Sequence, residues 1–247
     1  MPFSEIVGQD RAVGSLRAAL RRGALHHALL LAGPPGVGKG TAARILAQAL
    51  NCEMGGRSLT APGGADGRGQ GQPDEAAPER AGGMGGRSLT APPHLQDDGC
   101  GQCGPCRKIA RGLHPDVLLV EEERVMARAG RWEPRGGRAP SRDIVVDQIR
   151  DLVDRRLALK RFEGRHRVVI LDPADAMNPQ AQNALLKTLE EPPEDTVLVL
   201  VASAPDALLP TVRSRCLRLS FGPLPDELVA ARLAGAGRPP EEARLAA

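Results

Sequence analysis

The stretch Gly33-Pro-Pro-Gly-Val-Gly-Lys39 lies between an apolar run at 28–32 and a helical pattern at 41–50. A glycine-rich loop that joins a buried strand to a helix is the setting of a phosphate-binding P-loop. Its glycines let backbone N–H groups face the phosphates, the N-terminus of the following helix favours an anion, and Lys39 reaches the β and γ phosphates. The stretch therefore predicts a nucleotide-binding α/β fold.

Gly40 departs from the P-loop pattern. The pattern has a Ser or Thr after its lysine, and the hydroxyl of that residue binds Mg²⁺. Here Gly40 follows Lys39, and Thr41 comes one position later. The departure favours nucleotide binding over efficient hydrolysis.

A second departure concerns the acids that serve hydrolysis. Asp172 follows the apolar run at 167–171 and fits the Mg²⁺-facing role at the end of a neighbouring strand. Pro173 comes next. Hydrolytic P-loop enzymes carry at this position a glutamate that polarises the attacking water, and Asp175 is the nearest further acid in this chain. We therefore expect the site to lack its own general base.

The rest of the chain alternates short apolar runs with helical patterns. Asn178 and Pro179 suit the N-cap and the first residue of one helix. Short buried strands separated by helices predict a five-stranded parallel sheet flanked by helices. We expect strands at 28–32, 116–120, 167–171, 196–202 and 217–221, and helices at 9–22, 41–50, 102–112, 144–159, 179–190, 206–214, 225–234 and from 240 onward.

Two segments differ from this pattern. Residues 54–98 contain 11 Gly and 5 Pro and carry MGGRSLTAP twice, at 54–62 and 84–92, so we expect a disordered insertion. Residues 124–142 carry six arginines with several Gly and Pro, and we expect a solvated loop. The remaining chain divides into a domain at 1–222 and the start of a small helical domain at 223–247.

Composition excludes some classes of protein. Only Phe3, Trp132, Phe162 and Phe221 are aromatic among 247 residues, which leaves no platform for base stacking, and a net charge of +3 is too small to indicate nucleic-acid binding by itself. No apolar stretch has the length of a membrane span, and residues 1–9 lack the pattern of a signal peptide. We therefore expect a cytoplasmic protein with reduced cysteines.

Four of the five cysteines have the spacing of a metal site. Cys100, Cys103 and Cys106 are each separated by two residues, and Cys52 ends the helix after the P-loop. Four thiolates in a reducing compartment suit a closed, tetrahedral structural zinc site. The insertion explains the long gap before Cys100, whereas Cys216 lies apart and is expected in the core.

The triplet Ser214-Arg215-Cys216 precedes the last expected strand. In a P-loop protein, an arginine can stabilise the charge of phosphoryl transfer in a neighbouring subunit. A solvated arginine is the alternative that composition alone favours.

Together these features resemble the clamp-loader family of AAA+ proteins. The run at 183–193 and the Ser-Arg-Cys triplet are the most specific parts of the resemblance. The matching segments are Ile6-Val-Gly-Gln9, Gly33 to Lys39, the four cysteines, His114-Pro-Asp116, Val146-Asp-Gln-Ile149, Asn183-Ala-Leu-Leu-Lys-Thr-Leu-Glu-Glu-Pro-Pro193 and Leu209-Pro-Thr-Val-Arg-Ser-Arg-Cys216.

The resemblance implies roles for these residues. Arg215 would be an arginine finger that reaches in trans to ATP on a gamma or tau subunit, and Cys52, Cys100, Cys103 and Cys106 would hold zinc. Ser203 would be the hydroxyl-bearing sensor, carried over on its hydroxyl alone. ATP with Mg²⁺, if the pocket is used, would contact Val7, Gly8, Gln9, Gly33, Pro34, Pro35, Gly36, Val37, Gly38, Lys39, Gly40, Thr41 and Asp172.

The resemblance also implies a place in an assembly. It makes residues 1–222 an AAA+ nucleotide-binding-type domain and 223–247 an incomplete helical lid, with the family's C-terminal collar domain absent. Pro173 favours the delta-prime group over the gamma/tau group, whose members are the ATPase motors. The expected function is that of a stator and arginine-finger donor in the DNA polymerase III holoenzyme, with little ATPase activity and no polymerase site of its own. Its partners would be gamma/tau and delta subunits, the sliding clamp and, through the complex, primed DNA.

Three alternatives stay open from the sequence. A gamma/tau-type ATPase motor would need a substitute for the missing glutamate, and only Asp175 is near. An adenylate-kinase-like phosphotransferase is suggested by Lys39-Gly-Thr41, although the four cysteines and the run at 183–193 have no place in that chemistry. A zinc module that binds DNA directly is disfavoured by the few aromatics and the modest charge.

Overall fold

The computed structural model describes residues 2–53, 88–89 and 98–235. Both copies of the nonapeptide repeat, apart from Ser88 and Leu89, and the helix expected from 240 onward lie outside the described residues. Among the described residues, no helix has both the length and the apolar character needed to cross a membrane.

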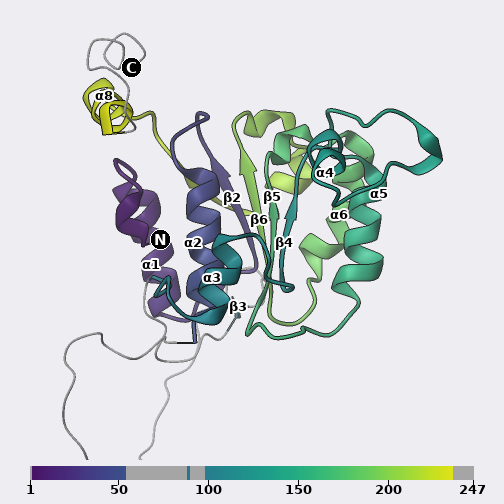
Figure 1. Ribbon diagram of the computed structural model, residues 1–247, viewed down its shortest axis with the longest axis horizontal. Coiled ribbons are helices and arrows are strands. Elements are labelled where there is room, and N and C mark those ends of the chain that lie inside the picture. Colours follow the sequence, from purple (N-terminus) through teal and green to yellow (C-terminus); the bar gives the residue numbers. More distant parts are fainter. Residues whose placement is uncertain (1, 54–87, 90–97, 236–247) are drawn as a thin grey trace, which may run out of the picture.

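The central element is a five-stranded sheet whose neighbouring strands are all parallel (Figure 1). The prediction of a five-stranded parallel sheet is therefore confirmed. The strands come from distant parts of the chain, in the order β4 (Val117–Val120), β5 (Arg167–Leu171), β6 (Thr196–Ala202), β2 (Ala28–Ala32) and β7 (Leu217–Ser220).

Helices cover both faces of the sheet (Figure 1). One face packs against α1 (Asp10–Arg21) and α2 (Lys39–Asn51), with α3 (Gly104–Ala110) beside α2. The other packs against α5 (Val146–Asp151), its π-helical continuation η3 (Leu152–Leu157), and α6 (Pro179–Glu190). Because side chains alternate between the faces of a strand, β2 contributes Leu29 and Leu31 to the first core and Leu30 to the second.

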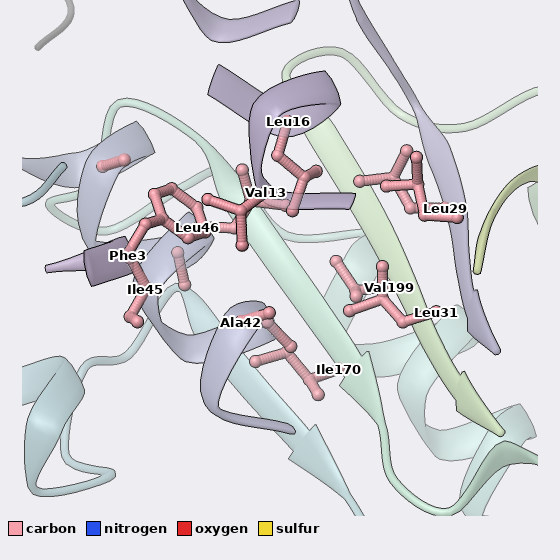
Figure 2. Close-up of a cluster of buried hydrophobic side chains, with 14 of the residues drawn as sticks. Phe3, Val13, Leu16, Leu29, Leu31, Ala42, Ile45, Leu46, Ile170 and Val199 are labelled. Atoms are coloured by element: carbon pink, nitrogen blue, oxygen red, sulfur yellow. The ribbon is translucent and has the colours of Figure 1, made fainter. Parts of the chain in front are cut away.

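The first core is purely aliphatic apart from two phenylalanines. Figure 2 shows Leu29 and Leu31 of β2 on the sheet and Ile45 and Leu46 of α2 in the same cluster, with Phe3 beside them. Phe221 is the second aromatic ring of this cluster. A core built almost entirely from Leu, Val, Ile and Ala explains how the chain folds with so few aromatic residues.

Helix boundaries follow the local chemistry that the sequence indicates. The Asn178 side chain accepts a hydrogen bond from the Ala181 N–H at 2.8 Å, and Pro179 is the first residue of α6, as expected. The helix expected at 206–214 instead splits into η5 (Pro205–Ala207) and α7 (Pro210–Arg213). Pro210 disfavours helical torsion angles in the residue before it, and Leu209 is indeed extended.

The expectation of disorder at 54–98 is wrong at two places. Ser88–Leu89 form strand β3, which pairs antiparallel with β1 (Leu25–His26). Asp98 accepts a hydrogen bond from the Phe3 N–H at 2.8 Å and forms an ion pair with Arg17 at 3.0 Å. Strand pairing with β1 orders Ser88–Leu89, and the contacts of the Asp98 carboxylate order residue 98. Composition reveals neither interaction.

The expectation of a solvated loop at 124–142 is also wrong in part. The segment opens with α4 (Glu123–Arg128), and the fully buried Glu123 carboxylate binds Arg138 through both guanidinium Nη atoms, at 2.6 and 2.7 Å. Glu123 also accepts from the Trp132 Nε1–H and the Ser141 N–H. Burial raises the pKa of Glu123, but these donors outweigh burial and lower it overall. One buried acid therefore organises the segment.

Candidate functional site

The P-loop lies where β2 ends and α2 begins. The Lys39 side chain is buried, and its Nζ donates to the Gly33 carbonyl at 2.7 Å, the Pro34 carbonyl at 2.5 Å and the Ser203 Oγ at 3.3 Å. Burial lowers the pKa of Lys39, and the charges of Asp172 and Asp175 oppose that effect. The structure thus brings together Lys39, Ser203 and the two acids that the sequence singled out.

Close approach of the backbone explains why residue 33 is glycine. A Cβ atom at this position would lie 2.1 Å from the Phe221 carbonyl oxygen, a contact that backbone cannot relieve. Phe221 follows β7, and its N–H donates to the Ala32 carbonyl at 2.7 Å. Gly33 therefore lets the P-loop pass directly beside the end of β7.

Gly40 faces the carboxylate of Asp172. A Cβ atom at position 40 would lie 2.6 Å from the Asp172 Oδ2, so a Ser or Thr side chain would collide with this carboxylate where it stands. Burial raises the pKa of Asp172, and Arg44 is the strongest charge that lowers it. The Mg²⁺-binding hydroxyl is therefore missing, and an acid lies against the position where it would be attached.

Pro173 and Asp175 bear on the expectation that the site lacks its own general base. Pro173 follows Asp172 directly, and the Asp175 carboxylate accepts hydrogen bonds from the Ser203 N–H at 3.3 Å and the Ala204 N–H at 2.9 Å. Asp175 thereby fixes the chain after β6. Its contacts are those of a residue that holds a loop, and they agree with the expected loss of the water-activating acid.

Residues 7–9, which are expected near an adenine ring, contact residues that follow β7. Gln9 is buried, and its side-chain amide pairs with the backbone of Gly222 in both directions, at 2.8 and 2.9 Å. A Cβ atom on Gly8 would meet Leu224 at 2.9 Å, and Val7 is 40 % exposed. Residues 7–9 thus contact the start of α8 (Asp226–Gly235) and its approach, and the adenine role stays a prediction.

Arg215 lies at the opposite edge of the sheet from the P-loop. It precedes Leu217, which pairs with Leu29 near the start of β2, whereas Gly33 lies beyond the end of β2. At about 3.3 Å per residue, these two levels are about 13 Å apart along the strands. The Arg215 guanidinium is bound by Glu190 and by the Thr211 carbonyl, and its side chain is 35 % exposed. Arg215 therefore cannot serve the P-loop of its own chain from this position.

The four predicted cysteines converge at the end of α2. Their sulfur atoms lie within 4.8 Å of one another, and the Sγ atoms of Cys52 and Cys103 are 3.9 Å apart. Tetrahedral coordination with metal–sulfur bonds of about 2.3 Å places sulfurs about 3.8 Å apart. The chemistry and spacing of the donors fit a metal such as zinc. Cys216 is not part of this cluster and packs against the core beside α6, as expected.

The surroundings of the cysteines shift the pKa values of Cys100 and Cys106 in opposite directions. The N–H groups of Cys103 and Gln102 donate to the Cys100 sulfur, and although burial opposes them, the pKa of Cys100 is lowered to about 7. Burial raises the pKa of Cys106 well above its usual range. A buried thiol of that kind becomes a thiolate only beside a positive charge.

The sequence analysis missed the structural roles of two acids, although both lie in motifs that it quoted. Asp116 accepts hydrogen bonds from the backbone N–H groups of Phe162, Glu163 and Gly164 and faces Arg167 at 3.6 Å. It thereby fixes the loop before β5. Glu190, which binds Arg215, lies 25 residues away from it in sequence, so no local spacing could have linked the two.

A P-loop, a degraded set of hydrolytic acids, a four-cysteine cluster and an arginine at the far edge define the class to which this chain belongs. The family model described as "DNA polymerase III, delta subunit" matches residues 86–225, more than half of the chain. The chain belongs to this family, and the resemblance to clamp-loader AAA+ proteins is confirmed.

Individual relatives agree with this assignment. The DNA polymerase III subunit delta' of Pseudomonas aeruginosa is 44 % identical over 126 residues, which are 51 % of this chain and 33 % of that protein. The DNA polymerase III subunit gamma/tau of Mycobacterium bovis is 32 % identical over 232 residues, 94 % of this chain and 30 % of that protein. This chain therefore matches about a third of the length of these relatives.

Among solved structures, a DNA polymerase III gamma subunit-related protein of Thermotoga maritima aligns with a TM-score of 0.36 at 28 % identity. The alignment covers 51 % of this chain and 38 % of that chain.

Proposed function

We propose that this chain is a clamp-loader subunit of DNA polymerase III that acts as a stator and donates an arginine finger in trans. Its partners are gamma/tau and delta subunits, the sliding clamp and, through the complex, primed DNA. Residues 1–222 would form the AAA+-type domain, and 223–247 would belong to a helical lid. Its own P-loop binds nucleotide weakly or not at all and contributes little hydrolysis.

The position of Arg215 carries the proposal. It stands at the edge of the sheet opposite its own P-loop and is partly exposed, so it is accessible to a nucleotide bound by another subunit. A guanidinium that approaches the γ-phosphate stabilises the charge that develops during phosphoryl transfer. Arg215 supplies that charge, and the neighbouring subunit supplies the P-loop and the acids.

The chain's own P-loop also supports a role as arginine-finger donor with little hydrolysis of its own. Lys39 and the P-loop backbone can bind phosphates, and the Asp172 carboxylate would face Mg²⁺. Position 40 has no hydroxyl to complete that site, Pro173 cannot accept a proton, and Asp175 is bound to backbone N–H groups. The residues needed to bind a nucleotide are thus better retained than those needed to hydrolyse it.

The four cysteines are proposed to hold a structural zinc ion. Their donor set is closed, since all four positions of a tetrahedron are taken by sulfur from this chain. The bound ion would join the end of α2 to α3, two helices that already pack together and are linked by the Gln48 side chain, which donates to the Cys106 carbonyl at 2.9 Å.

The test uses a loader in which only the ATPase subunit adjacent to this chain retains its P-loop lysine. Arg215→Ala should lower DNA-stimulated ATP turnover at least about 10³-fold, because an arginine finger contributes that much to turnover. Arg213→Ala is the matched control, since Arg213 lies two residues away and forms a similar exposed ion pair with Asp206. Undiminished turnover in Arg215→Ala would refute the trans role.

A second candidate is an ATPase motor of the gamma/tau type, because the gamma/tau match extends over 94 % of the chain. This function requires ATP turnover by the isolated chain that Lys39→Ala abolishes. The contacts of Asp175 speak against it, whereas measured turnover of that kind would establish it. The adenylate-kinase-like alternative rests on Lys39-Gly-Thr41 alone, and membership of the family speaks for the loader.

A further inference from the structure

We infer that α6 sets the orientation of Arg215 through Glu190 and Gln182, which makes Glu190 a positioning residue for the trans arginine. The inference deepens the proposed function and rests on it. No spacing in the sequence indicates the link, because Glu190 lies at the end of α6 and Arg215 follows α7.

Glu190 holds one edge of the guanidinium. The Nε and Nη2 atoms of Arg215 both donate to the Glu190 Oε1, the former at 2.8 Å, and Nη1 donates to the Thr211 carbonyl at 2.8 Å. A guanidinium has five N–H donors. Three are engaged here, which fixes the plane of the group and leaves two donors for an oxygen of another molecule.

Gln182, two turns earlier on α6, fixes the chain that leads to Arg215. Its buried side chain accepts a hydrogen bond from the Leu209 N–H at 2.6 Å and donates to the Ala207 carbonyl at 3.3 Å. Leu209 is the residue before α7. The amide therefore fixes the start of α7, and Glu190 fixes the side chain just after its end.

The helix links this arrangement to the P-loop edge of the sheet. α6 begins at Pro179, shortly after Asp172, and ends at Glu190. An arginine finger works only in a narrow geometry, and a displacement of about 1 Å can reduce a rate about 10²-fold. A flexible arginine on the surface would lose much of its effect, so a carboxylate that fixes its plane raises turnover in trans without contacting the nucleotide.

The experiment compares Glu190→Gln with Glu191→Gln in the same loader with one active site. Glu191 is exposed and adjacent, which makes it a matched control for the loss of one charge. Glu190→Gln should lower the kcat for ATP about tenfold and leave KM unchanged, because the substitution affects the transition state alone. Thermal unfolding should be unchanged, because an exposed ion pair adds little to stability.

The decisive measurement repeats Glu190→Gln in an Arg215→Ala loader. If Glu190 acts through Arg215, the second substitution causes no further loss. An equal loss in both backgrounds, or a Glu190→Gln kcat that matches Glu191→Gln, overturns the inference while leaving the proposed function standing. A normal rate in Arg215→Ala alone refutes the proposed function first, so the two failures can be told apart.

Discussion

The two edges of the sheet differ in the residues that they carry. At the carboxyl edge, where the carboxyl ends of the strands lie, the P-loop retains its lysine and glycines. Gly40 and Pro173 stand there at the positions where hydrolysis needs a hydroxyl and a carboxylate. At the amino edge, where the amino ends of the strands lie, Glu190 holds Arg215 and the four cysteines converge. Under the proposed function, this difference means that the chain lacks groups needed to hydrolyse its own nucleotide and carries a group that would act on a nucleotide bound by a neighbouring subunit.

The largest predicted effect is a contrast between the two edges. In the loader with one active site, Arg215→Ala should lower ATP turnover at least about 10³-fold. Lys39→Ala should change it less than about twofold, because the chain's own site contributes little. Steady-state rates of the two variants decide the matter, and a large loss from Lys39→Ala would place essential chemistry at the carboxyl edge.

The next effect concerns the cysteines of the amino edge. The purified, reduced protein should contain about one equivalent of zinc, and Cys52→Ser should lower zinc content and destabilise the fold by about 3 kcal/mol or more. Cys216→Ser is the control, since its thiol lies outside the cluster. Metal analysis and chemical unfolding test both parts. Zinc retained after Cys52→Ser, or absent from the unaltered protein, would contradict the assignment.

At the carboxyl edge, Glu123 should matter for stability and not for turnover. Glu123→Gln breaks a buried ion pair whose Arg138 partner is half-exposed, so we expect a loss of about 2 kcal/mol. The pKa of Glu123 is lowered in the folded chain, so its contribution is present above the unfolded pKa and is lost as pH falls through the folded one. Urea unfolding at neutral and acidic pH measures both, with Glu133→Gln, which lies in the same segment and is exposed, as control.

Local patterns predicted the fold well and long-range contacts poorly. The strands β5 and β6 match the expected ranges because they are buried, uninterrupted apolar runs, and α6 matches because Asn178 and Pro179 define its start. The cysteines could be grouped because thiols have few other roles in that spacing. The contacts Glu123–Arg138 and Glu190–Arg215 could not be predicted, because each joins groups that only the fold brings together.

The smallest predicted effect is that restoring the missing P-loop hydroxyl at the carboxyl edge does not raise ATP turnover. Gly40→Thr restores the hydroxyl that the P-loop pattern requires, yet its Cβ would lie 2.6 Å from the Asp172 Oδ2, so the carboxylate must move before Mg²⁺ can be bound. Pro173 would still offer no base. ATP turnover of the isolated Gly40→Thr variant should therefore stay at the level of the unaltered chain, in a direct phosphate-release assay.

Pro173→Glu, alone and combined with Gly40→Thr, separates the two deficits of the carboxyl edge. If hydroxyl and base are both required, only the double variant can gain turnover, and Lys39→Ala must abolish that gain. Turnover that rises with Gly40→Thr alone would show that a base is already present. The acid responsible would then be Asp175 or Glu121, whose charge raises the pKa of Asp172, and the contrast between the two edges would reduce to one missing hydroxyl.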